Sequence, residues 1–283
     1  MRYKLTLYFI VVLALNGSAQ STQGFVTVNN GKIYYEKMGE GPILLFLHGV
    51  ALDHRMWEDQ VNYFSKHFTC ITIDLRGFGK SSVPSDSPYS FHDDINVLLD
   101  TLKINEPVVL IALSLGGRAA VNFSLAYPER TRALVLADVI IDGYSLKNFK
   151  LDPVYELAKQ KGTDSANRMF FNYPIFKSAR QDSVTYKRLE TIMMSYSGWT
   201  WIHKNPIKSL NPPAIQQLDQ IHVPVLIITG ENDVWDFQEV AKILHTGIKQ
   251  SVIKQIPDCG HLCNMEKPGE FNKLVSDFLT SIR

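Results

Sequence analysis

The feature that most constrains this chain is a series of short apolar runs separated by amphipathic stretches. The runs cover residues 43–47, 70–73, 108–112, 133–137, 225–228 and 251–253. They are apolar on both faces, which is typical of parallel strands covered by helices. Apolar residues at helical spacing occupy residues 91–102, 115–126 and 271–282. This alternation predicts an α/β fold with a mostly parallel sheet and helices on both faces.

Two local patterns refine this expectation. Residues 25–28 and 32–36 read as strands, and Asn29-Asn30-Gly31 between them is a hairpin turn signal. Within the helical stretch 91–102, the acidic residues fall away from the apolar positions, so we expect a solvent-facing polar face made of Asp93, Asp94 and Asp100.

The stretch from residue 142 to residue 220 breaks the alternation, because it contains no strand-like run. It carries short helical patterns and many aromatic residues: Tyr155, Phe170, Phe171, Tyr173, Phe176, Tyr186, Tyr196, Trp199 and Trp201. We interpret it as a helical cap over the sheet; the alternative is plain helical packing within the core. The predicted core is then residues 20–141 and 221–283, with residues 142–220 as the cap.

The first residues have the pattern of a secretory signal peptide. Arg2 and Lys4 precede an apolar run over residues 5–15, and Gly17-Ser18-Ala19 forms a small-residue cleavage site before Gln20. The sequence therefore predicts a signal peptide over residues 1–19 and a secreted or periplasmic protein. An uncleaved anchor or a mis-assigned start are the alternatives. No second run of membrane length follows, so no membrane association is expected after cleavage.

The net charge and the cysteine content limit the classes of ligand, disulfide and metal site that this chain can have. The formal net charge is +1 and no Lys/Arg cluster stands out, which argues against nucleic acid and favours a small-molecule substrate. Three cysteines, Cys70, Cys259 and Cys263, allow at most one disulfide, and whether any forms is left open. Cys259 and Cys263 flank His261, but no further Cys or His pair completes a tetrahedral metal site. Oligomeric state is also left open.

The segment Ala112-Leu113-Ser114-Leu115-Gly116-Gly117 follows an apolar run and precedes a helical pattern. It resembles the nucleophile elbow of the α/β-hydrolase superfamily. A sharp strand-to-helix turn needs small residues around its serine; Gly116 meets this need, and Ala112 stands where the family usually has Gly. The resemblance implies that Ser114 is the nucleophile and that the N–H groups of the following helix face developing negative charge.

Two further segments resemble loops of the same superfamily. His48-Gly49-Val50 matches its His-Gly-x loop, with Asp53 at the frequent downstream acid. The resemblance implies an oxyanion hole made of the backbone N–H groups of Val50 and Leu115, with His48 and Gly49 in structural roles.

The segment Asp74-Leu75-Arg76-Gly77-Phe78-Gly79-Lys80-Ser81 matches the Asp-x-Arg-Gly-x-Gly-x-Ser loop. Its implied role is structural, with an internal pair between Asp74 and Arg76. A phosphate-binding loop is the alternative, but the Walker ending is missing.

The remaining pieces lie near the end of the chain. Asp233 follows Gly230 at the place where the family has its triad acid, and His261, after Gly260, matches the family's catalytic histidine, with Glu266-Lys267-Pro268 behind it. The order Ser, Asp, His is the one expected of this superfamily. Asp138, at the end of the run over residues 133–137, is the rival for the acid.

The resemblance spans roughly residues 43–268 and implies a serine hydrolase. Ser114 would attack a carbonyl carbon, His261 would act as base and then acid, and Asp233 would orient the imidazole. No cofactor or metal is needed. An ester of a small, fairly apolar molecule is the expected substrate. The alternatives are an aminopeptidase or amidase, a C–C bond hydrolase, and a small-molecule receptor with slow turnover.

Overall fold

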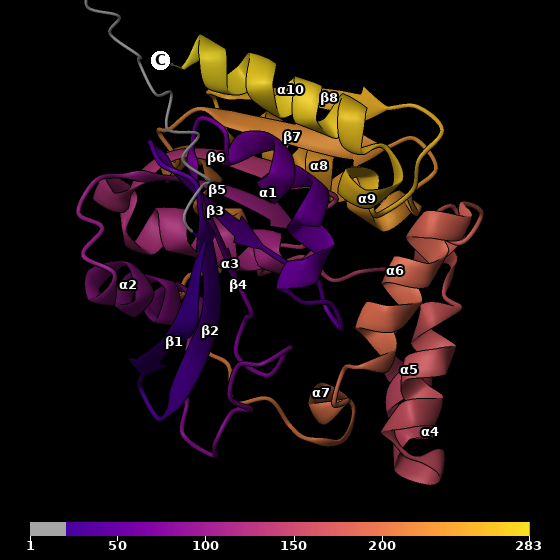
Figure 1. Cartoon of the computed structure of the whole chain (residues 1–283). Coiled ribbons are helices and arrows are strands. Elements are labelled where there is room, and N and C mark those ends of the chain that lie inside the picture. The colour runs from indigo at the N-terminus through magenta and orange to yellow at the C-terminus, as the bar shows by residue number, and fades with distance from the viewer. Residues whose placement is uncertain (1–20, 283) are drawn as a thin grey trace, which may run out of the picture.

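The computed structural model describes residues 21–282, so the predicted signal peptide lies outside the described residues. Eight strands form one sheet in the order β1-β2-β4-β3-β5-β6-β7-β8 (Figure 1). The pairs β1–β2 and β2–β4 are antiparallel, and every pair from β4 to β8 is parallel. The predicted α/β fold with a mostly parallel sheet is therefore confirmed.

Each apolar run of the sequence is a strand, and the three helical patterns are helices. The strands are β1 (Thr22–Val28), β2 (Gly31–Met38), β3 (Ile43–Leu47), β4 (Thr69–Ile73), β5 (Val108–Leu113), β6 (Thr131–Ala137), β7 (Val225–Gly230) and β8 (Ser251–Ile256). The helices around them are α1 (Glu58–Phe64), α2 (Phe91–Thr101), α3 (Leu115–Ala126), α8 (Trp235–Gly247), α9 (Cys263–Glu266) and α10 (Pro268–Ser281).

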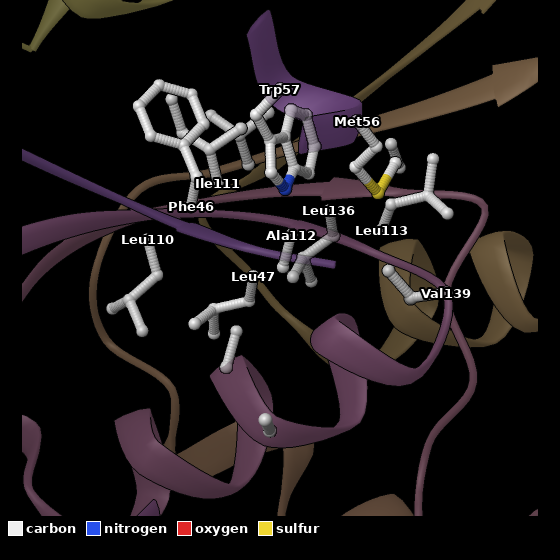
Figure 2. Close-up of a cluster of buried hydrophobic side chains, with 14 of the residues drawn as sticks. Phe46, Leu47, Met56, Trp57, Leu110, Ile111, Ala112, Leu113, Leu136 and Val139 are labelled. Carbon is white, nitrogen blue, oxygen red and sulfur yellow. The ribbon is translucent and has the colours of Figure 1, made fainter. Parts of the chain in front are cut away.

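The hydrophobic core lies on both faces of the sheet. Helices α1 and α10 cover one face, and α2, α3 and α8 cover the other (Figure 1). Figure 2 shows Phe46 and Ile111 pointing toward Trp57 on one side of the strands, while Leu47 and Leu110 point toward the opposite side. All five of these side chains are fully buried. Burial on both faces explains why β3 and β5 read as continuous apolar runs.

Strand β8 departs from the expectation that every run is buried on both faces. Val252 is 48% exposed and Ile253 is 36% exposed. The reason is position, because β8 is the last strand of the sheet and pairs on one side only, with β7. The apolar run predicted the strand correctly but not its place at an edge.

The predicted internal pair of the Asp74 loop is wrong, and so is the predicted exposure of Asp94. The guanidinium of Arg76 reaches α2, where its Nε and Nη2 donate to Asp94 at 2.9 and 2.6 Å. Both side chains are buried, so Asp94 is a core ion-pair partner rather than part of a solvent-facing surface. Asp74 instead accepts hydrogen bonds from the backbone N–H groups of His54 and Lys80, each at 2.8 Å.

Residues 142–220 contain helices and no strand. They are α4 (Asp152–Lys161), α5 (Thr163–Phe171), α6 (Ser183–Met194) and α7 (Trp199–Ile202), with short 3-10 turns at Pro174–Phe176, Ala214–Gln216 and Leu218–Gln220. Helices α4 to α6 lie together beside the sheet (Figure 1). The division into a core and a cap stays a prediction. Across the described part of the chain, no helix combines the length and apolarity needed to cross a bilayer.

Many of the aromatic residues in this stretch contact one another. Phe170 packs against Tyr173, Phe176 and Trp201 with ring centroids 5.2–5.3 Å apart, and Tyr196 packs against Trp201 at 5.6 Å. Tyr155 of α4 packs against Trp201 with ring centroids 5.9 Å apart, so α4, α5 and α7 share a small aromatic core that includes most of the aromatic residues singled out here.

Candidate active site

Ser114 sits at the turn between β5 and α3. Its backbone has φ 53° and ψ −115°, a strained conformation for a residue with a side chain. The turn is held on both sides, because the Ser114 N–H donates to the carbonyl of Ala137 at 3.1 Å and its carbonyl accepts from Gly117 and Ile140 at 3.0 and 3.2 Å. Strain held in this way by surrounding hydrogen bonds is found at functional sites.

Gly116 and Gly49 of the predicted motifs both pack closely against neighbouring residues, and at Gly116 a side chain would not fit. A Cβ on Gly116 would lie 2.2 Å from the carbonyl oxygen of Leu47, so α3 can begin against the end of β3 only with glycine there. A Cβ on Gly49 would lie 3.0 Å from a methyl of Leu113 and 3.3 Å from the Cβ of Ser114. The loop after β3 therefore passes directly beside Ser114.

The backbone N–H groups of Val50 and Leu115 were predicted to form an oxyanion hole. Both residues line the same cavity as Ser114. Within residues 21–282, neither N–H donates to a backbone carbonyl in the loops and turns. An oxyanion hole requires N–H groups that are free of other backbone acceptors, so the finding is compatible with this role, and the oxyanion hole stays a prediction.

His48 lies in the interior and serves the loop itself. Its Nδ1 lies 2.7 Å from the carbonyl oxygen of Gly49, and its Nε2 accepts from the N–H of Leu75 at 2.9 Å. Complete burial lowers the pKa of His48, so the ring is neutral with its proton on Nδ1. It ties the loop after β3 to the loop after β4.

His261 and Asp233 form a direct pair. Nδ1 of His261 lies 2.8 Å from Oδ2 of Asp233, and the other carboxylate oxygen accepts from the N–H of Val234 at 2.7 Å. Both side chains are buried. The imidazole packs against Phe237, with ring centroids 4.2 Å apart. This is the geometry in which a carboxylate fixes one imidazole tautomer.

Ser114 and His261 are brought to the same end of the sheet, after β5 and β8. No hydrogen bond joins their side chains among the described residues, although Phe237, which packs on His261, lines the Ser114 cavity.

Glu266 and Gly230, to which the sequence assigns no role beyond their place in the motifs, hold the His261 loop in place. The carboxylate of Glu266 accepts from the N–H of Gly260 at 2.9 Å and from that of Leu262 at 3.1 Å, on either side of the histidine. A Cβ on Gly230 would lie 2.0 Å from the carbonyl oxygen of Gly260. The Asp233 and His261 loops are therefore in backbone contact, and only glycine allows it.

Asp236 is a further residue that sequence reasoning missed. Its carboxylate is fully buried and accepts the backbone N–H groups of Lys147, Asn148 and Phe149 at 2.6–2.8 Å. Asp236 lies in the first turn of α8, so it links the Asp233 loop to the segment that leads into α4. An acid three residues after another is too common a pattern to predict this contact.

Asp138 is the predicted rival for the triad acid. Its carboxyl accepts from the N–H of Gly230 at 3.2 and 3.3 Å and from Sγ of Cys263 at 3.1 Å. Burial, and after it the charge of Asp233, raise the pKa of Asp138 well above its usual range. Of the two acids, Asp233 is the one hydrogen-bonded to His261.

The cysteines that flank His261 are both buried free thiols, with their sulfur atoms 3.2 Å apart. The neighbouring thiol of Cys259, and after it burial, raise the pKa of Cys263 well above its usual range, so the group stays protonated. In the described residues, the groups that come close enough to share a metal ion are Asp53, His54 and Asp74. Their carboxylates already accept hydrogen bonds from Arg55, His54 and Lys80, so nothing suggests a metal there.

A cavity of about 600 Å³ opens over Ser114. Its walls are mostly apolar. They come both from the stretch 142–220 and from the rest of the chain, and include Phe78, Phe149, Tyr155, Trp201 and Phe237. Of the nine aromatic residues singled out between residues 142 and 220, only Tyr155 and Trp201 reach it.

The polar lining of this cavity is basic. Arg118, Lys159, His203 and Lys204 border it, and no Asp or Glu does within the described chain. Arg118 is partly neutralised by Asp142, whose Oδ1 lies 2.6 Å from Nε, and Lys159 lies 3.2 Å from Glu156.

A second cavity of about 670 Å³ is larger but lies elsewhere, between β2, β4, α1 and α6. Glu36 and His54 border it, and His54 is bonded to Asp74 at 2.7 Å. It is lined by neither Ser114 nor His261, so the smaller cavity is the one that Ser114 lines.

Comparison with known proteins agrees with this architecture. A family model described as alpha/beta hydrolase fold matches residues 42–268. A putative 2-succinyl-6-hydroxy-2,4-cyclohexadiene-1-carboxylate synthase of Bacillus subtilis is 29% identical over 91% of this chain and 98% of its own. The carboxylesterase YbfK of the same organism is 26% identical over 92% and 88%. The structure of an esterase from Exiguobacterium antarcticum superposes with a TM-score of 0.78 at 23% identity, over 92% of this chain and all of the other.

Proposed function

Because the chain belongs to the alpha/beta hydrolase family, we propose that it is a serine hydrolase that cleaves an ester of a small, largely apolar molecule. The observation that supports this most directly is the pairing of His261 with Asp233 at 2.8 Å, at the same end of the sheet as the strained Ser114. Esterase activity among the relatives, as in the Bacillus subtilis carboxylesterase, points in the same direction.

The proposed mechanism uses only side chains and backbone groups of this chain. His261 takes the proton of Ser114, whose oxygen attacks the ester carbonyl. Two backbone N–H groups, of Val50 and Leu115, receive the oxyanion; losing one such donor costs about 2.7–4 kcal/mol of transition-state stabilisation. His261 then protonates the leaving alcohol, and water repeats the sequence on the acyl-enzyme.

The experiment that tests this function compares p-nitrophenyl esters of increasing acyl length with matched anilides. We expect steady turnover of the esters and far slower turnover of the anilides. Faster cleavage of an aminoacyl anilide would favour the peptidase alternative. A receptor would give little steady turnover but strong thermal stabilisation by its ligand.

The basic lining of the Ser114 cavity predicts a preference for substrates that carry an anionic group. We expect an aryl half-ester of a dicarboxylic acid to have a kcat/KM about three- to tenfold above that of a neutral ester of equal size, because partly exposed ion pairs contribute modestly and are screened by salt. The preference should fall as ionic strength rises. Steady-state kinetics at two salt concentrations measures it.

A double variant, Lys159→Gln with Lys204→Gln, removes two positive charges from the cavity lining. Lys273→Gln, which removes one positive charge from α10, is the control. The double variant should lose most of the preference, and the control should retain it. Equal kcat/KM for the charged and neutral esters at low salt would rule out an anionic subsite while leaving ester hydrolysis intact.

We also propose that the protein acts outside the cytoplasm, on the basis of the charged start, apolar run and small-residue site of residues 1–19. Expression with export should give a mature chain that begins near Gln20. Intact-mass measurement of the exported protein checks this. Recovery of the full-length chain from the cytosol alone would contradict it.

A further inference from the structure

Asp138 is a buried carboxyl that the proposed mechanism does not use. It directly follows β6, with a φ of 45°, which is uncommon for a residue with a side chain. Only 1% of its surface is exposed. Asp138 and Asp233 both border the turn at Gly230, whose N–H donates to the Asp138 carboxyl and whose carbonyl accepts from the Asp233 N–H at 3.2 Å.

The groups that surround Asp138 supply no positive charge to balance it. The N–H of Gly230, at the end of β7, lies 3.2 Å from one carboxyl oxygen and 3.3 Å from the other. The titratable groups that face it are Asp233 from the loop after β7 and the thiol of Cys263 from α9, with Cys259 behind that thiol. His261 is bonded to Asp233 and makes no bond to Asp138.

A hydrogen bond between two carboxyl groups needs a proton on one of them, because two carboxylates offer only acceptors. Two adjacent carboxylates in a dry site also repel each other strongly. Asp233 accepts from the Nδ1 side of His261 and from the N–H of Val234. Burial raises the pKa of Asp138 well above its usual range, and the charge of Asp233 raises it further.

We propose that Asp138 is a positioning residue that keeps its proton at neutral pH and donates it to Asp233, thereby holding that carboxylate toward His261. The catalytic consequence rests on the proposed function, whereas the location of the proton does not. The triad acid is then supported by a second, neutral acid instead of by an N–H donor or a cation.

The location of the proton is tested through stability, without any substrate. A carboxyl that stays protonated in the folded protein ionises in the unfolded chain, so the folded state binds one more proton and loses stability as pH rises. Relative to Asp138→Asn, the unfolding equilibrium constant of the unmodified protein should rise about tenfold per pH unit from near pH 4 up to the folded-state pKa. Urea unfolding at several pH values measures this ratio.

The exposed Asp86 provides the control, and Asp86→Asn should give a ratio that stays flat over the same pH range. A flat ratio for Asp138→Asn as well would mean that Asp138 is ionised in the folded protein, and would overturn the proposal.

The positioning role is tested by comparing two substitutions. Asp138→Ala removes the donor and should lower kcat about tenfold or more, in the range expected for groups that orient a catalytic residue. Asp138→Asn keeps a neutral donor of the same shape and should restore most of that loss. The acid limb of the pH profile of kcat/KM should lie at the same pH in Asp138→Asn as in the unmodified protein, because no charge near His261 has changed. A limb that moves to lower pH, or an Ala variant as active as the Asn variant, would contradict the positioning role.

Failure of this proposal and failure of the proposed function can be told apart. If a fluorophosphonate does not label Ser114, the hydrolase assignment fails, yet the stability ratio still reports whether Asp138 carries a proton. If labelling succeeds and the ratio is flat, only the role of Asp138 is lost.

Discussion

Replacing Asp233 with Asn should lower kcat about 10⁴-fold at neutral pH while the protein stays folded. The Asp233 carboxylate accepts from Nδ1 of His261 at 2.8 Å and therefore keeps the proton on that nitrogen. An amide in its place can present an N–H to the same nitrogen, which stabilises the wrong tautomer and leaves no free base at Nε2. Steady-state ester hydrolysis, with circular dichroism as the check on folding, measures the effect.

The comparison with Asp138 makes this result specific. Asp138→Asn should cost tenfold or less, and the exposed Asp86→Asn should leave kcat unchanged. A large loss of kcat in Asp138→Asn, together with near-normal kcat in Asp233→Asn, would instead identify Asp138, after β6, as the triad acid.

Ser114→Ala should abolish covalent labelling by a fluorophosphonate and lower ester hydrolysis on the order of 10³-fold or more. The reason is that the serine oxygen forms the acyl-enzyme, and the remaining oxyanion donors and binding contacts give only residual catalysis. Mass spectrometry of the labelled protein locates the modified residue.

Ser124 on the same helix is the matched control, since it is also buried but lies more than two helical turns beyond Ser114. Ser124→Ala should label like the unmodified protein. Labelling that persists in Ser114→Ala would place the reactive nucleophile elsewhere.

The strands and the order of the chemical residues could be predicted because they depend on local signals. A buried parallel strand must be apolar throughout, and a strand-to-helix turn as sharp as that at Ser114 needs glycine nearby. Both requirements concern residues that are adjacent in the sequence. The predicted place of Asp233 and His261 rested on family patterns, and the structure brings these two side chains into contact.

The partners of buried charges could not be predicted in this way. Arg76 was expected to pair with Asp74, two residues away, but it binds Asp94 on α2 because burial leaves a charge to be matched by whatever element packs against it. The hydrogen bond from the Gly230 N–H to Asp138 has the same origin: neighbouring strands β6 and β7 end side by side, and sequence distance says nothing about it.

The aromatic core shared by α4, α5 and α7 has a consequence for how this protein can diverge. Trp201 and Tyr155 belong to that core and also line the Ser114 cavity, whereas Ile202 and Lys204 line the cavity from exposed positions outside the core. Substitutions at Ile202 and Lys204 leave the aromatic packing intact, and changes at surface positions usually alter stability by less than about 0.5 kcal/mol. Selection can therefore reshape the substrate range of this scaffold without first destabilising it, as long as the aromatic core is kept.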